Sequence, residues 1–91
     1  MRQQRKADAL VELRRASELD PRSTRFGYVY AVALHDSGQA AQAIRLLEQV
    51  TARDPRDQAV LQALLAFEKA RGNSVKAAYW AARLQALEAA R

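Results

Sequence analysis

The chain has 91 residues and a net charge of +5, from 15 basic and 10 acidic side chains, with one histidine and no cysteine. This length allows one small domain, and the lack of cysteine excludes disulfides and thiolate metal sites as supplements to its core. His35 has no carboxylate at ligand spacing except Asp36, so we expect neither a metal site nor a cofactor.

No segment of the sequence predicts a membrane span, because no apolar run approaches the roughly 20 residues that a spanning helix needs. The basic start of the chain is not followed by an apolar stretch, so we expect no signal peptide there. The compartment stays open. We expect the cytoplasm by default, and the periplasm if the chain is a piece of a longer exported protein.

The composition favours helices throughout. Alanine contributes 20 residues and leucine 11, whereas glycine contributes 3 and proline 2. Alanine and leucine are strong helix formers, and the β-branched and aromatic residues that strands favour are scarce. The sequence therefore predicts an all-α fold.

Prolines and glycines divide the chain into helices. Pro21 and Pro55 each end one helix, because proline cannot continue a helix through its own position. Gly38 and Gly72 suit the left-handed residue that often follows a helix. Polar side chains that can cap the next helix follow these breaks: Ser23 or Thr24, Asp57, and Asn73 or Ser74.

Five helices result, near residues 3–19, 23–37, 40–53, 57–71 and 74–90. Each carries apolar residues at three- and four-residue spacing, which is typical of a helix with one buried side. The loops between them have about two to four residues, so neighbouring helices must run antiparallel. In chain order, the apolar stripes are Leu10, Leu13 and Ala16; Phe26, Tyr30, Ala33 and Leu34; Ala43, Leu46, Leu47 and Val50; Leu61, Leu64, Leu65 and Phe67; and Ala77, Trp80, Leu84 and Leu87.

The sequence repeats with a period of 34 residues. The triplet Asp-Pro-Arg occurs at 20–22 and again at 54–56, and Gly38 is matched by Gly72. Several columns in one register are hard to obtain by chance, so we infer a structural repeat. The further columns are Ala9, Ala43 and Ala77; Leu13, Leu47 and Ala81; and Ala16, Val50 and Leu84.

A 34-residue helix-turn-helix unit with small residues at the helix crossing resembles a tetratricopeptide repeat. The segment AQAIRLLEQVTARDP is similar to the second helix of that family, with Ala43, Leu47 and Pro55 in the family's places. The family's tryptophan falls on Gly27 and Leu61 here, and its closing proline on Ala89. The segment YVYAVALHDSG also resembles tetratricopeptide segments attached to bacterial multihaem cytochromes, although the chain has no haem-attachment motif.

The resemblance implies one all-α, helix-turn-helix repeat solenoid of about five antiparallel helices. It divides the single domain 1–91 into a half repeat, 1–22, and two repeats, 23–56 and 57–91. It also implies a non-catalytic module or scaffold that binds a protein or peptide partner. We expect no enzyme, because the chain has no phosphate loop or paired-carboxylate pattern, and His35, Asp36 and Ser37 are adjacent residues whose side chains point apart.

The partner site implied by the resemblance is the concave face, which the first helix of each repeat lines. Tyr28, Val29 and Val32 are apolar there, although the core stripe lies on another side of their helix. We interpret them as a groove for an apolar or amphipathic peptide; the alternative is that the protein's own helices cover them. The expected groove residues are Arg25, Tyr28, Val29, Val32, His35, Gln62, Ala63, Ala66 and Lys69.

Two other functions are open to the sequence. The last helix could form an oligomer face through Trp80, Leu84 and Leu87, giving a homodimer through the terminal helices; the alternative is that Trp80 packs on the fourth helix. Nucleic-acid or anionic-surface binding is disfavoured, because the basic residues spread around their helix and no aromatic platform lies among them. Those residues are Arg2, Arg5, Lys6, Arg14 and Arg15.

Overall fold

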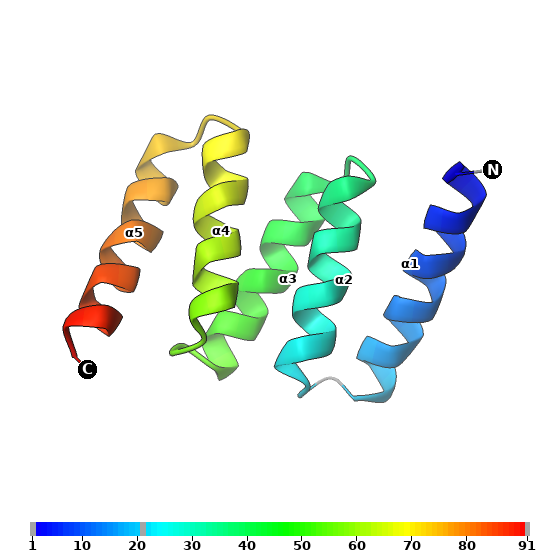
Figure 1. Ribbon diagram of the computed structural model, residues 1–91, viewed down its shortest axis with the longest axis horizontal. Helices are drawn as coiled ribbons and strands as arrows, with labels where there is room; N and C mark the ends of the chain where they lie inside the picture. Colours follow the sequence, from blue (N-terminus) through cyan, green and yellow to red (C-terminus); the bar gives the residue numbers. More distant parts are fainter. Residues whose placement is uncertain (1, 21, 91) are drawn as a thin grey trace.

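The computed structural model describes residues 2–20 and 22–90, and within them the regular elements are five α-helices (Figure 1). Each helix begins and ends within one residue of the bounds expected from the sequence. The expected all-α helical repeat is confirmed. The helices are α1 (Arg2–Leu19), α2 (Thr24–Asp36), α3 (Ala40–Arg53), α4 (Gln58–Ala70) and α5 (Ser74–Ala89).

Three of the helices begin at a side chain that caps them, as the sequence predicts. Ser23 Oγ accepts the backbone N–H of Phe26 at 3.2 Å, and Asp57 Oδ1 accepts that of Val60 at 3.1 Å. Asn73 Oδ1 likewise accepts the N–H of Lys76 at 3.2 Å. Each bond satisfies one of the amides that have no partner inside the helix, so these starts are determined locally.

The turns after α2 and α4 have the same construction. Gly38 has φ +84° and Gly72 has φ +77°, the left-handed region that side-chain-bearing residues rarely adopt. The N–H of Gln39 donates to Leu34 O at 2.9 Å, and the N–H of Asn73 donates to Glu68 O at 2.9 Å. These are the bonds that close a helix end on a left-handed residue. The other expected helix-ending residue, Pro55, lies in the exposed turn before α4, whereas Pro21 lies outside the described residues.

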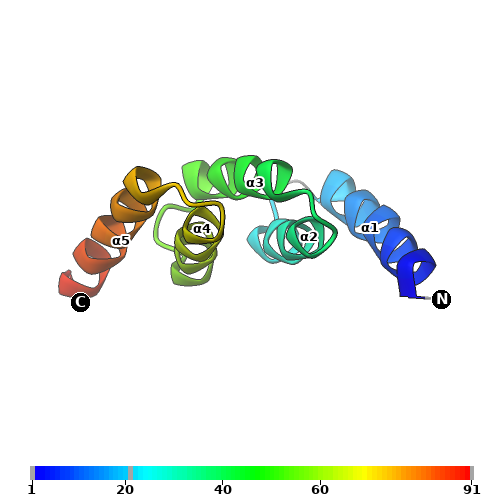
Figure 2. The same ribbon diagram turned by 90° about the horizontal axis from the view of Figure 1, so that it is seen from above.

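The helices form two rows (Figure 2). α1, α3 and α5 make an arch, and α2 and α4 lie on its inner side and run in the same direction. α2 and α3 form the first hairpin, and α4 and α5 form the second. α4 packs against both α2 and α3, so the second hairpin stacks on the first. The inner row therefore lines the concave face, which is where the sequence places the candidate groove.

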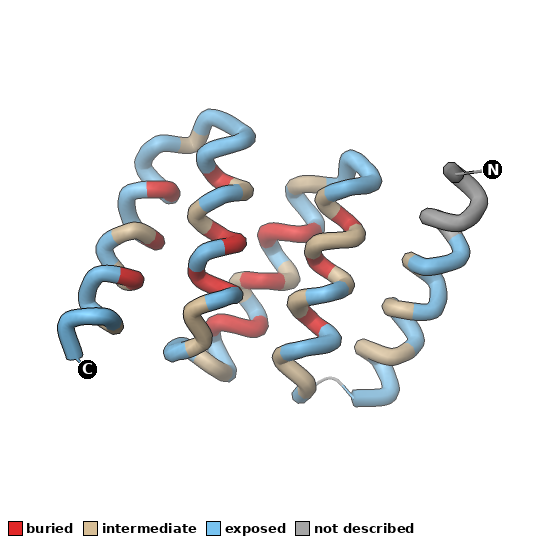
Figure 3. The backbone as a smooth tube through the Cα atoms, in the orientation of Figure 1, coloured by how far each residue is buried: buried red, intermediate tan, exposed pale blue. Residues whose placement is uncertain are grey.

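The core lies between the facing sides of α2, α3, α4 and α5 (Figure 3). Its largest fully buried apolar residues are Leu47, Leu61 and Leu64. Within residues 8–19 of α1 no residue is buried, and Leu10 only packs partly against the core. α1 therefore covers one side of α2 without becoming part of a closed core.

Candidate protein-binding surfaces

α2, a helix of the inner row, carries a row of four of the expected groove residues at three- and four-residue spacing. Arg25 is exposed, and Val29 is 39% exposed. Tyr28 and Val32 are half-buried, and Tyr28 also packs against the core. This row remains the candidate groove, although Tyr28 offers less free surface than the sequence suggests.

His35 continues this row to the end of α2, and it is held by an aromatic contact. Its ring stacks on that of Phe67 from α4, with the centroids 3.9 Å apart and the planes 6° from parallel. The stack joins the two helices of the inner row. His35 is thereby half-buried and part of the interface between the hairpins, rather than a freely exposed groove residue.

The α4 side of the candidate groove is polar and divided. Gln62, Ala66 and Lys69 are exposed. Ala63 is not, because it is a buried member of the core. The expectation that Ala63 is a free groove residue is therefore wrong, because its side chain is covered by the protein's own core.

The stripe on α5 that was expected as an oligomer face is largely buried within the chain. Trp80 is 4% exposed and Leu84 is 8% exposed, and both belong to the core, while Leu87 packs partly against it. These residues therefore do not form an exposed apolar face, because α5 turns this side toward the other helices. The alternative, in which Trp80 packs within the protein, is the one that the structure supports.

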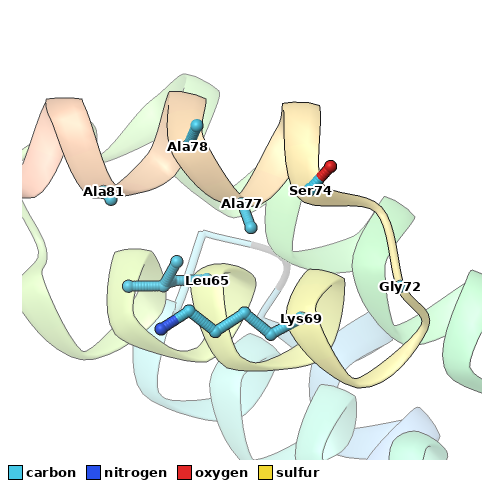
Figure 4. Close-up of a pocket in the computed structure, with 7 residues that line it drawn as sticks. All are labelled: Leu65, Lys69, Gly72, Ser74, Ala77, Ala78 and Ala81. Atoms are coloured by element: carbon cyan, nitrogen blue, oxygen red, sulfur yellow. The ribbon is translucent and has the colours of Figure 1, made fainter.

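A groove between α4 and α5 was not among the sites expected from the sequence (Figure 4). Its apolar lining is Leu65 of α4 with Ala77, Ala78 and Ala81 of α5, and it has a volume of about 350 Å³. Lys69, Gly72 and Ser74 complete its edge. We call this surface the open groove. The 34-residue period could have predicted the open groove, because each residue of its apolar lining lies 34 positions after a buried residue of α2 or α3.

Comparison with models of known protein families identifies the family of the chain. A model of the tetratricopeptide repeat family matches residues 1–67, which is most of the chain. The chain belongs to the tetratricopeptide repeat family. The search of curated proteins found no match to the sequence. As a member of this family, it is a protein–protein interaction module, and the repeats of the family are typically non-catalytic.

The polar groups of this tetratricopeptide repeat protein form no metal-binding cluster of three or more His, Asp or Glu side chains among the residues described. Glu68 is nonetheless buried on α4, with 1% exposure. Its Oε1 lies 3.9 Å from Arg71 Nη1 and accepts no hydrogen bond. None of the described helices is long and apolar enough to cross a bilayer.

The basic residues of α1 are only partly described in this repeat protein. Arg14 Nε is paired with Glu18 Oε1 at 3.1 Å on the exposed side of the helix, and Arg15 is exposed. The side chains of Arg2, Arg5 and Lys6 lie outside the described residues. The pairing of Arg14 with an acidic neighbour lowers the positive charge available on the described part of α1.

Proposed function

We propose that the protein binds a peptide or helix of a partner protein on its concave face, along α2 and α4. The observation that carries this proposal is Val29, an apolar side chain that stays 39% exposed on the inner row. Half-buried Tyr28 and Val32 lie beside it at helical spacing. A bound apolar side chain would remove Val29 and its neighbours from water, which is favourable in proportion to the area covered.

Exposed charged and polar side chains also occur on both helices of the inner row. Arg25 lies one turn before Val29 on α2, and Gln62 and Lys69 are exposed on α4. The cationic groups suit a partner with acidic residues beside its apolar ones, and the net charge of +5 would attract such a partner. Binding of this kind weakens as salt screens the charges.

The test begins with a display library of random 15-residue peptides, selected on the wild-type protein. Selected peptides are then measured by fluorescence anisotropy against Val29→Asp. The matched control is Val75→Asp, because Val75 is 80% exposed on α5, in the outer row. Circular dichroism of both variants checks that the helices are retained.

We expect Val29→Asp to weaken binding of the selected peptides at least about tenfold, because it places a carboxylate against their apolar residues. Val75→Asp should leave the affinity unchanged. Peptides that bind both variants as tightly as the wild type would overturn the concave-face site. Failure to select any peptide with micromolar affinity would do the same.

A further inference from the structure

The two hairpins of the protein expose equivalent surfaces to a different degree. On the first hairpin, α2 and α3 form a groove whose residues are buried, and we call it the filled groove. It consists of Ala31, Ala43, Ile44 and Leu47, which are at most 3% exposed. The equivalent residues 34 positions later are Leu65, Ala77, Ala78 and Ala81, the apolar lining of the open groove.

The filled groove is covered by a helix of the same chain. α4 packs against both α2 and α3 there. Phe67 identifies the side of α4 that does so, because its ring stacks on His35 of α2. Val60, Leu64 and Phe67 stand at i, i+4 and i+7, so they lie on the same side of α4. Val60 and Leu64 are completely buried. We call these three residues the apolar ridge.

None of the helices in residues 2–20 and 22–90 covers the open groove as α4 covers the filled groove, and the exposure of the lining residues differs accordingly. Ala78 is exposed, whereas its counterpart Ile44 is buried; Ala81 is half-buried, whereas Leu47 is completely covered. The open groove therefore has the shape of a helix-binding surface and a lining that is apolar and partly in contact with water.

We propose that the open groove binds one amphipathic helix of another polypeptide, in the manner in which α4 fills the filled groove. The helix carries bulky apolar residues at i and i+4 and an aromatic residue at i+7. The last requirement follows from Lys69, which edges the open groove at the position equivalent to His35. The ammonium group of Lys69 would lie over the aromatic ring at i+7, and this cation–π contact would take the place of the His35–Phe67 ring stack.

This site is separate from the concave face proposed above. Its apolar lining comes from the junction of α4 and α5 (Figure 4), whereas Tyr28, Val29 and Val32 belong to α2. The two surfaces share only Lys69. Variants at Ala78 and at Val29 therefore report on different sites.

The probe for the test is a peptide with the sequence of α4, residues 57–71, because this helix fits the equivalent groove. Its helix is locked by a lactam between Gln62→Lys and Ala66→Asp, two positions that are exposed in the protein and lie off the apolar ridge. Leu65→Gln improves its solubility. Binding of the labelled peptide to the intact 91-residue protein is measured by fluorescence anisotropy.

The protein variants are Ala78→Glu, which fills the open groove with a charged side chain, and Ala82→Glu as the matched control. Both alanines are exposed on α5, so neither change disturbs the core, and circular dichroism checks this. Ala82 does not line the open groove. The matched peptide control replaces Leu64 of the apolar ridge with lysine.

We expect the peptide to bind the wild type and Ala82→Glu equally, and Ala78→Glu at least about tenfold more weakly. The Leu64→Lys peptide should not bind. The proposal is overturned if the wild type does not bind the locked peptide, or if Ala78→Glu and Ala82→Glu bind it alike. Loss of binding in Val29→Asp but not in Ala78→Glu would also overturn it, and would place the peptide on the concave face.

Sedimentation of the wild type alone tests another occupant. The proposal requires a monomer over the concentrations used for binding. A dimer that Ala78→Glu dissociates and Ala82→Glu does not would overturn it, because a second copy would then cover the open groove.

Discussion

The first and second hairpins share one sequence pattern, and the difference between them shows what a neighbour contributes to burial. Ala43 and Ala77 occupy the same column and are both buried, because each is covered within its own hairpin. Ile44 and Ala78 also share a column, but of the two helices that carry them only α3 has a following helix packed on it among the described residues, and only Ile44 is buried. In such an array the burial of a residue depends on the next repeat as much as on its own.

The largest effect that this comparison predicts is on two leucines that line the two grooves. Leu47→Ala should lower the free energy of unfolding by about 2–5 kcal/mol, because the completely buried side chain would leave a cavity under α4. Leu65→Ala should cost about 1 kcal/mol, because Leu65 is only half-buried in the open groove. Urea denaturation followed by circular dichroism measures both. Equal losses would show that the two grooves are equally covered in solution.

A second prediction concerns Leu34 and Glu68, which occupy the same column in the two hairpins and are both buried. Glu68→Leu should raise the free energy of unfolding by roughly 1–4 kcal/mol, because a buried carboxylate with one distant cation gives way to an apolar side chain. Glu88→Leu, an exposed change on α5, is the control and should shift stability by less than about 0.5 kcal/mol. Destabilisation by Glu68→Leu would contradict this account.

The third prediction concerns the close approach of α2 and α3 at Gly27, where the second hairpin has Leu61. A Cβ at Gly27 would lie 2.7 Å from Val50 Cγ2. Gly27→Ala should therefore cost about 1–2 kcal/mol, even after a gain of about 1 kcal/mol in helix propensity. Adding Val50→Ala should remove the overlap, so a double-mutant cycle should give a favourable coupling between the two changes. If the two changes alter the free energy of unfolding additively, the overlap at Gly27 carries no energetic cost, because α2 and α3 can move apart freely.

The smallest effects are expected at the turns, where the two hairpins should behave alike. Gly38→Ala and Gly72→Ala should each cost about 1 kcal/mol, because both glycines have a positive φ. Apart from the adjacent residues, no atom lies within 4 Å of the added Cβ at either position, so the expected cost is backbone strain. Thermal unfolding of the two variants should show matching decreases in Tm. A clear difference between them would locate a contact that the turns do not share.

The helices were predictable from the sequence because their ends are determined by nearby residues. Ser23, Asp57 and Asn73 each cap a helix through an amide three residues away. Gly38 and Gly72 close the preceding helices in the same local manner. The 34-residue period then indicated the stacking of equivalent hairpins, because residues that make the same contact recur in the same register.

The candidate sites were harder to predict, because the free side of a helix depends on what packs around it. Val29 is exposed, whereas Ala63 is buried and His35 is held by Phe67. A stripe such as Trp80 and Leu84 has the same pattern whether it faces the core or a second molecule. The choice between these is made by the position of the whole helix.

The sequence by itself determined five helices, their turns and their repetition, because capping, left-handed glycine and helical periodicity act over a few residues. Only the tertiary structure decided which equivalent residues are covered. α4 lies over the groove of the first hairpin, and no described helix lies over the groove of the second. The physical reason is that burial is a property of two surfaces in contact, and a repeated sequence specifies only one of them at a time.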